Sequence, residues 1–159
     1  ERVNARTHGY NNQAPDANGR RIWKILALFQ ATYVGAPMIY YGTEIGMWGA
    51  DDPEDRMPTA WNQIDSEMRD SYQSALALRH KYSALRRGDF KVLETRDGSQ
   101  FFAFERSLGD ERIVIVLNRG NGDATLGNDY LDGLSLVYAT DGRASSKRLP
   151  ALSGAVFAK

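Results

Sequence analysis

The feature that most constrains the fold of this chain is a change in hydrophobic period near Gly88. Before Gly88, apolar residues recur at helical spacing in two stretches, residues 18–33 and 66–87. After it, short runs alternate between apolar and polar residues and are separated by turn sequences such as Asp97-Gly98. The pattern predicts an α/β part over residues 1–88, followed by an all-β part over residues 89–159.

The α/β part is expected to run helix, strand, loop, helix. Residues 36–41 form a short apolar run bounded by Pro37 and Gly42, which is typical of a fully buried strand in a parallel sheet. Gly35 is placed to end the first helix, and Gly88 is placed to end the second. One strand with two helices cannot close a sheet, so we expect this part to need further partners.

The all-β part contains five candidate strands. They cover residues 90–95, 101–106, 113–118, 134–139 and 155–158. Their spacing and the turns between them predict an antiparallel β-sandwich. Because side chains alternate across a strand, Phe102 and Phe104 are expected on one face and Phe101 on the other.

Composition excludes several classes of function. The 20 Lys and Arg residues balance the 20 Asp and Glu residues, so no strong field is present to recruit nucleic acid or a membrane surface. Cysteine is absent, which excludes a disulfide framework and a cysteine nucleophile. His8 and His80 are too far apart in sequence to indicate a metal site, and no cofactor is expected.

Several segments together carry a resemblance to a known family. They are GAPMIYYGTEIGM at residues 35–47, DPEDR at 52–56, LRH at 78–80 and ALR at 84–86. In this order and spacing they resemble the alpha-amylase family, glycoside hydrolase family 13, and are similar to its cyclomaltodextrinase and neopullulanase-type members. The resemblance implies that residues 36–41 are the eighth strand of a (β/α)8 TIM barrel, that the helix at 66–87 closes the barrel, and that the β-domain follows it.

The resemblance also implies where catalysis takes place in the parent enzyme, a glycosidase that acts on α-linked glucans. Family members use an Asp nucleophile, a Glu acid/base and a further Asp in a His-Asp pair, and the retaining mechanism needs two carboxyl groups about 5–5.5 Å apart. No His-Asp dipeptide occurs in this sequence. We therefore expect the three catalytic acids upstream of Glu1, no catalytic residue in this chain, and no hydrolysis by the chain alone.

Three residues are expected to bind substrate. Asp52 and Arg56 match a family pair that binds glucose hydroxyls, since an Asp accepts two hydroxyl bonds and an Arg fork donates two. The structural alternative for this pair is a solvated ion pair that braces a loop. Trp48 lies in the same loop, where its ring suits either the apolar face of a sugar or packing against the barrel rim.

Three further residues are expected to support the site. Glu44 directly follows the predicted strand, where a carboxylate needs a hydrogen-bonded partner. Tyr41 is expected to pack at the barrel mouth, and Arg2 to brace the loop behind the missing third acid. The acids at 51–55 lack the spacing of a calcium loop, so no metal site is expected.

Two other functions stay open on the sequence alone. One is a non-catalytic amylase-like protein, and the other is an autonomous sugar-binding β-module, for which residues 90–159 alone would fold and bind glucan. For the enzyme, the expected partner is an α-glucan oligosaccharide. An unpaired strand at 37–41 and uncovered helix faces also predict that the chain associates with itself.

Overall fold

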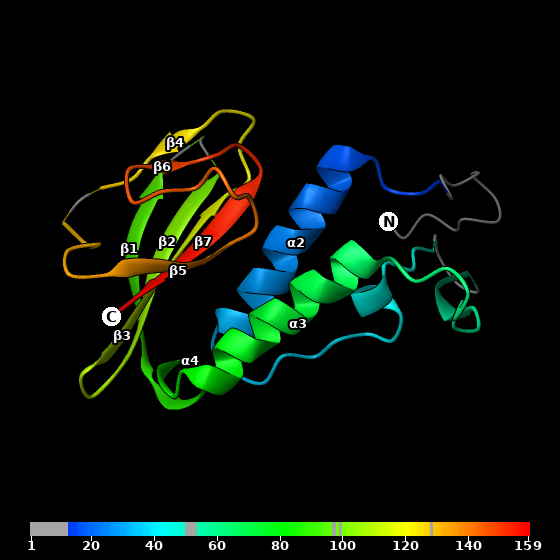
Figure 1. Cartoon of the computed structure of the whole chain (residues 1–159), viewed down its shortest axis with the longest axis horizontal. Helices are drawn as coiled ribbons and strands as arrows, with labels where there is room; N and C mark the ends of the chain where they lie inside the picture. Colours follow the sequence, from blue (N-terminus) through cyan, green and yellow to red (C-terminus); the bar gives the residue numbers. More distant parts are fainter. Residues whose placement is uncertain (1–12, 50–53, 97, 99, 128) are drawn as a thin grey trace, which may run out of the picture.

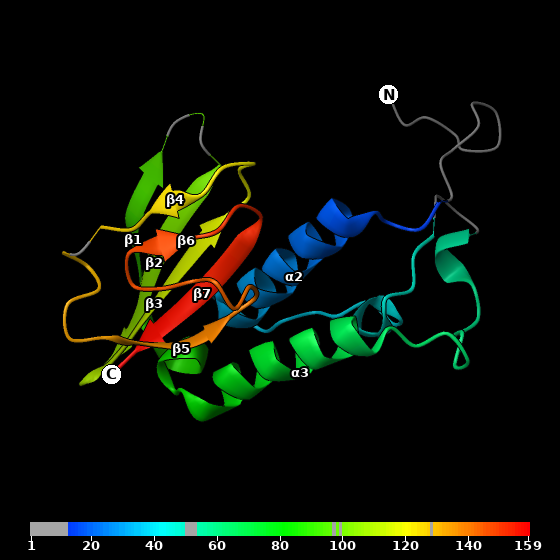
Figure 2. The same cartoon turned by 45° about the horizontal axis from the view of Figure 1, so that its top comes forward.

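The structure, a computed structural model, describes residues 13–49, 54–96, 98, 100–127 and 129–159. An antiparallel sheet lies at one end, one long helix packs against it, a second long helix packs against the first, and loops lie at the other end (Figure 1, Figure 2). The sheet has five strands in the order β1-β2-β3-β7-β5. These strands are β1 (Asp89–Arg96), β2 (Phe101–Leu108), β3 (Glu111–Asn118), β5 (Ser135–Ala139) and β7 (Ser153–Ala158). All five predicted strands are thus confirmed.

Both faces of this sheet are covered, as the apolar runs in β3 and β7 require. One face presents Phe104, Ile113, Ile115 and Val156 to the helices. The other presents Phe101, Ala103, Val114 and Phe157 to a second core, which Leu126, Leu131 and Leu149 complete. Phe104 and Phe102 therefore share a face, and Phe101 takes the opposite one, as predicted.

The predicted sandwich is realised in part. On the face away from the helices, β4 (Ala124–Thr125) and β6 (Arg148–Leu149) form a two-stranded antiparallel sheet that sequence patterning did not reveal. Strands of two residues are too short to show an alternating pattern. The layers are therefore helices, a five-stranded sheet, and a small sheet with loops.

Helix α2 (Ala17–Thr32) is capped at its N-terminus by Asp16, whose side chain accepts a hydrogen bond of 2.7 Å from the N–H of Gly19. Its buried side chains include Ile25 and Leu28, which belong to the helix-side core. Leu26, next to Ile25 on the same helix, is 56% exposed. The apolar face of α2 is therefore wider than the surface that the sheet and the other helices cover.

The helix predicted over residues 66–87 is interrupted. Helix α3 (Ser66–Lys81) ends where Tyr82 adopts an extended conformation, and the short α4 (Ala84–Arg87) follows. The guanidinium of Arg86 on α4 donates to the carbonyls of Arg79 and His80 in the last turn of α3. A side chain of α4 therefore caps the C-terminus of α3. Apolar spacing is the same on both sides of this break, which explains why the sequence pattern missed it.

The prediction of a buried strand at residues 36–41 is wrong for this structure. Residues 36–40 are extended but pair with no strand among the described residues, and Met38 is 74% exposed. The side chain of Gln30 donates to the carbonyl of Met38 instead. We call residues 33–49 the arm, which runs along the helix pair and away from the sheet (Figure 1, Figure 2).

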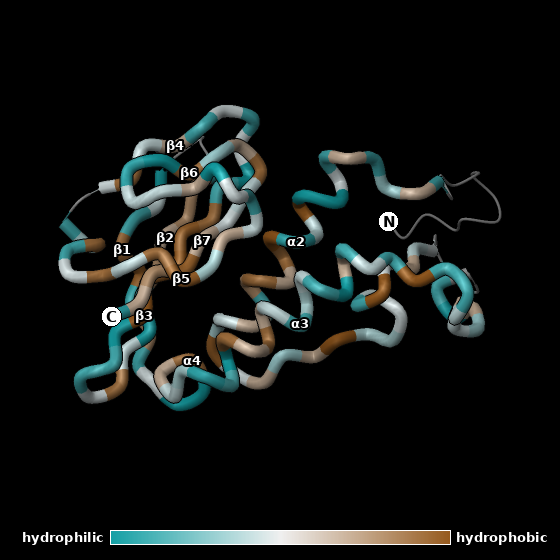
Figure 3. Tube along the Cα trace, viewed as in Figure 1, coloured by the Kyte–Doolittle hydropathy of each residue, from teal (hydrophilic) through white to brown (hydrophobic). Residues whose placement is uncertain are grey.

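The helices and the sheet share one core. Figure 3 shows hydrophobic residues on the central strands, on the helices beside them, and again along the arm. The domain boundary near Gly88 stays a prediction, since side chains from both sides of Gly88 pack together in the helix-side core. Among the described residues, no helix has the length and apolar character needed to cross a bilayer.

Candidate functional site

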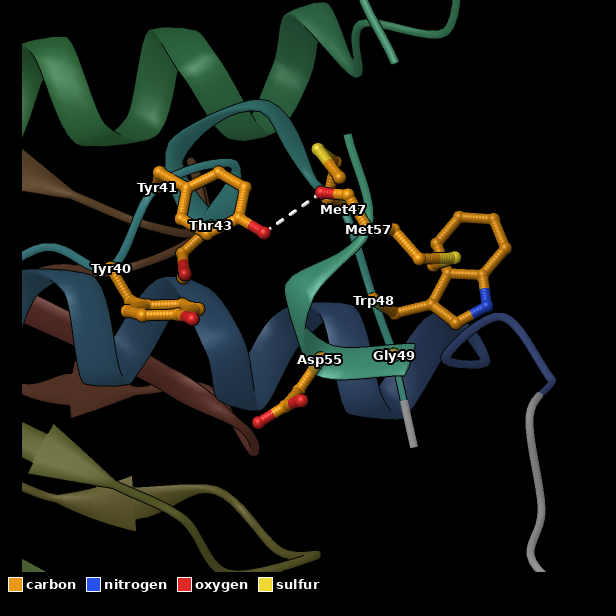
Figure 4. Close-up of a pocket in the computed structure, with 8 residues that line it drawn as sticks. All are labelled: Tyr40, Tyr41, Thr43, Met47, Trp48, Gly49, Asp55 and Met57. Atoms are coloured by element: carbon orange, nitrogen blue, oxygen red, sulfur yellow. Dashed lines mark hydrogen bonds between the residues drawn. The ribbon is translucent and has the colours of Figure 1, made fainter. Parts of the chain in front are cut away.

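The arm and the loop after it enclose a hollow of about 160 Å³ at the end of the molecule remote from the sheet (Figure 4). Two short 3-10 helices frame it, Thr43–Ile45 on the arm and Glu54–Arg56 on the loop. The described residues that line it are Tyr40, Tyr41, Thr43, Met47, Trp48, Gly49, Asp55 and Met57.

Two glycines turn the arm so that its side chains reach the hollow. Gly42 and Gly46 flank the first 3-10 helix with φ of 84° and 79°, a left-handed conformation that favours glycine. The N–H of Asp65 donates to the carbonyl of Ile45 over 2.9 Å, which joins this turn to the start of α3. A Cβ on Gly46 would lie 2.6 Å from the Cβ of Asp65, so the close approach also requires glycine.

Aromatic side chains form the walls of the hollow. The rings of Tyr40 and Tyr41 are 4.8 Å apart and tilted by 50°. The hydroxyl of Tyr41 donates to the carbonyl of Met57 over 2.8 Å and so joins the arm to the loop (Figure 4). Partial desolvation, with the nearby Tyr40 and Asp55, raises the pKa of Tyr41 above 10, so this hydroxyl stays protonated at neutral pH.

Trp48 and Tyr41, two of the predicted site residues, both line this hollow. Trp48 is 42% exposed, so much of its indole is open to a ligand. Arg56 lies on the adjacent 3-10 helix with its Nε 3.9 Å from Oδ1 of Asp55. Asp52 and Arg2 lie outside the described residues, so the pairing of Asp52 with Arg56 stays a prediction.

Glu44 is placed differently from expectation. Its Oε2 atom is buried and has no hydrogen-bond partner among the described residues, although a partner was predicted. The carboxylate is near the hydroxyl of Tyr72. This hydroxyl also accepts a hydrogen bond of 3.3 Å from the indole N–H of Trp23. Burial raises the pKa of Tyr72, and the charge of Glu44 adds to this increase.

Sequence reasoning missed part of this surface. Trp48 and Met57 also line a neighbouring hollow of about 380 Å³, together with Gly46, Met47, Pro58, Ala60 and Gln63. Trp61, a second loop tryptophan, is 75% exposed but is not among the residues that line either hollow. The signal that singled out Trp48, a tryptophan in a loop, applied equally to Trp61.

The described side chains of the hollow offer several aromatic faces and one carboxylate. Among the described lining residues Asp55 is the one carboxylate, whereas retaining glycoside hydrolysis needs two. No group of three or more His, Asp or Glu in the described part of the chain is arranged to hold a metal ion. Flat aromatic faces beside a carboxylate suit a ligand that has apolar ring faces and hydroxyl groups.

Comparison with known proteins relates the chain to glycosidases. No family model matches it. It is 40% identical over 105 residues to a cyclomaltodextrinase of Geobacillus thermopakistaniensis, a match that covers 65% of this chain and 18% of that enzyme. It is 35% identical over 123 residues to neopullulanase 2 of Thermoactinomyces vulgaris, covering 71% of this chain and 21% of the relative. The chain therefore spans about a fifth of the length of these relatives.

The fold is also found in solved structures. The debranching enzyme of Nostoc punctiforme, in a crystal soaked with acarbose, superposes with a TM-score of 0.74 and 30% identity. That match covers 90% of this chain and 30% of the solved chain. The likeness thus includes helices and sheet together.

Proposed function

We propose that this chain, which is related to the glycosidases of the alpha-amylase family, is part of a longer retaining glycoside hydrolase that acts on α-linked glucans. In this proposal the chain supplies one wall of the glucan-binding cleft, the end of the catalytic barrel and the β-domain. It carries none of the catalytic acids and does not hydrolyse glucan by itself.

The observation that carries this proposal is the aromatic hollow at the end of the arm. Tyr40 and Tyr41 end the extended segment, and Trp48 follows on the loop beside them. Loops that follow the strands of a (β/α)8 barrel lie on its active-site face. If residues 36–41 form a barrel strand in the parent enzyme, then Tyr40, Tyr41 and Trp48 lie at its active-site end, where a sugar chain would meet them. Asp55 adds an acceptor for the sugar hydroxyls.

Uncovered surface on the arm supports the barrel-end assignment. A hollow of about 490 Å³ runs beside α2, lined by Leu26, Phe29, Gln30, Tyr33, Val34, Ala36, Pro37 and Met38. Leu26, Val34 and Met38 in this lining are each more than half exposed, and a cluster of exposed apolar side chains favours a partner that covers it. In the parent enzyme, neighbouring strands and helices of the barrel would cover it, and a donor from them would reach Oε2 of Glu44. In the separate chain, we propose that self-association covers this surface.

The structure favours the enzyme part over an autonomous β-module. Phe104, Ile115 and Val156 on the sheet pack against Leu28, Leu85 and other helical residues in one core. Residues 90–159 alone would expose this apolar face, which costs about 25 cal/mol for each Å² returned to water.

Trp48→Ala tests the proposal. We expect the full chain to bind maltoheptaose and acarbose weakly, and Trp48→Ala to lower the affinity about tenfold because the aromatic face is lost. The measurement is isothermal titration calorimetry at millimolar ligand concentrations.

Trp61→Ala is the matched control, since Trp61 is an exposed loop tryptophan that does not line the hollow of Figure 4. It should leave the affinity unchanged. A Trp48→Ala variant that binds as well as the unmodified chain would show that the hollow is not the glucan site.

A further inference from the structure

Arg106 is a buried arginine on β2 whose partners are all backbone carbonyls. Arg106 is only 1% exposed. The guanidinium donates to Thr32 over 3.0 Å, to Leu85 over 3.1 Å, to Gly88 over 2.9 Å and to Asp89 over 3.1 Å. One side chain of the sheet therefore connects the end of α2, the end of α4 and the start of β1.

Arg79 on α3 makes a second set of carbonyl contacts beside the first. It donates to Ala31 over 3.0 Å, to Tyr33 over 3.2 Å and to Leu85 over 2.7 Å, and it also donates to Gly35. Leu85 accepts from both arginines, so the two sets meet at one carbonyl. Tyr33 and Gly35 are the first residues of the arm.

The chemistry of these contacts explains why arginine is needed. The last carbonyls of a helix have no partner within the helix and carry partial negative charge. The last turn of α2 has no basic residue of its own. Arg79 and Arg106 supply the missing donors and charge from other elements. Among the described residues, neither arginine lies within ion-pair distance of a carboxylate.

The arm is therefore held at both ends. Arg79 binds its first carbonyls, and the Ile45–Asp65 hydrogen bond attaches its first 3-10 helix to α3. The residues between, 36–41, have no strand partner. Gln30 of α2 also donates to the carbonyl of Met38 within this stretch. The direction of the stretch therefore depends on the position of α2 and on where its start is fixed, and the sheet contacts the end of α2 through Arg106.

We propose that Arg79 and Arg106 are positioning residues that transmit the placement of the β-sheet to the arm and so set the orientation of the aromatic hollow. The hollow's role in glucan binding rests on the proposed function, whereas the placement of the arm does not.

The absence of cysteine allows a direct measurement of this placement. Met38→Cys on the arm and Ser74→Cys on α3 both introduce thiols at exposed positions. Nitroxide labels at these two sites, in full chain diluted with unlabelled chain, give a distance distribution by pulsed electron paramagnetic resonance. The variants are Arg79→Met, the milder Arg79→Lys, and Arg106→Lys. Arg112→Met is the matched control, because Arg112 binds Glu105 on β2 and the carbonyl of Tyr130 in the turn before β5, and contacts no helix through these bonds.

We expect the distribution to widen at least about twofold in Arg79→Met and Arg106→Lys, and by less in Arg79→Lys, since a lysine keeps the charge but cannot serve four carbonyls. It should stay unchanged in Arg112→Met. Thermal unfolding of each variant ensures that labels are read on folded chain. Unchanged widths in both arginine variants would overturn the inference and leave the arginines as core-stabilising groups. Maltoheptaose titration of the unmodified chain separates the two proposals. Wider distributions in the arginine variants, with no binding by the unmodified chain, would uphold the inference and refute the proposed function.

Discussion

Asp141 joins α2 to the loop after β5. Its carboxylate accepts from Arg21 over 3.1 Å, from the Arg143 side chain over 2.7 and 3.0 Å, and from the Arg143 N–H over 3.0 Å. The Arg143 side chain contributes most, and together these donors lower the pKa of Asp141 to about 2. Arg21 is on α2, so this residue is a further link between helix and sheet.

This shift predicts a pH dependence of stability. Because the pKa of Asp141 is lower in the folded chain than the usual 3.8, its stabilisation is present above about pH 4 and is lost as the pH falls toward 2. Arg143 is largely exposed, so screening limits the contribution to about 1 kcal/mol. We expect Asp141→Asn to be less stable than the unmodified chain at pH 7, and this difference to be clearly smaller at pH 2, where about half of the folded chains have a protonated Asp141. Urea unfolding at both pH values measures this, and a constant difference across the range would contradict it.

Arg106 marks the limit of residue-level prediction. The alternating pattern correctly placed it on a strand. Its side chain lies on the face of β2 opposite to the one that carries Phe101 and Glu105. Nothing in the pattern indicates that a charged side chain is buried there, since its partners are carbonyls contributed by three distant segments. Trp48, in contrast, was singled out from the sequence because a tryptophan in a loop is unusual in itself, and Tyr41 because it ends the predicted strand.

At the scale of elements, strong local patterns predicted well and patterns that depend on neighbours did not. Helix α2 and the five strands of the large sheet begin and end within two residues of their predicted bounds. Residues 36–41 have the composition of a buried parallel strand but lack strand partners among the described residues. A strand requires a neighbour, and composition cannot supply one.

The contact between α2 and the sheet gives a sharp prediction at Gly154 on β7. A Cβ there would lie 2.9 Å from Cδ2 of Leu28 and 3.0 Å from Cδ2 of Leu117. We expect Gly154→Ala to destabilise the chain by about 1–3 kcal/mol because the added methyl overpacks this interface.

Gly122→Ala serves as the control, since a Cβ at Gly122 would meet no atom within 4 Å. Its melting temperature by circular dichroism should be close to that of the unmodified chain. Equal melting temperatures for the Gly154 and Gly122 variants would mean that α2 does not pack closely on the sheet.

At the scale of the whole molecule, the two ends of the chain differ in how completely their apolar side chains are buried. The sheet end has two complete cores and two buried faces. The arm end exposes Met38, Tyr40 and Trp61 and leaves Oε2 of Glu44 without a partner among the described residues. This asymmetry fits a part of a larger enzyme whose binding cleft is completed by other segments, and it follows from tertiary placement that sequence patterns alone do not give.

The measurement that tests this account most directly is a titration of the 159-residue chain with maltoheptaose. Intact mass verifies the chain, amide NMR shifts report binding, and a reducing-sugar assay reports hydrolysis. The account predicts shifts near Tyr40, Tyr41, Trp48 and Met57, with no release of reducing sugar. Shifts confined to the β-sheet would instead support a sugar-binding β-module. Release of reducing sugar, with contaminating full-length enzyme excluded, would place the catalytic residues within this chain and contradict the account.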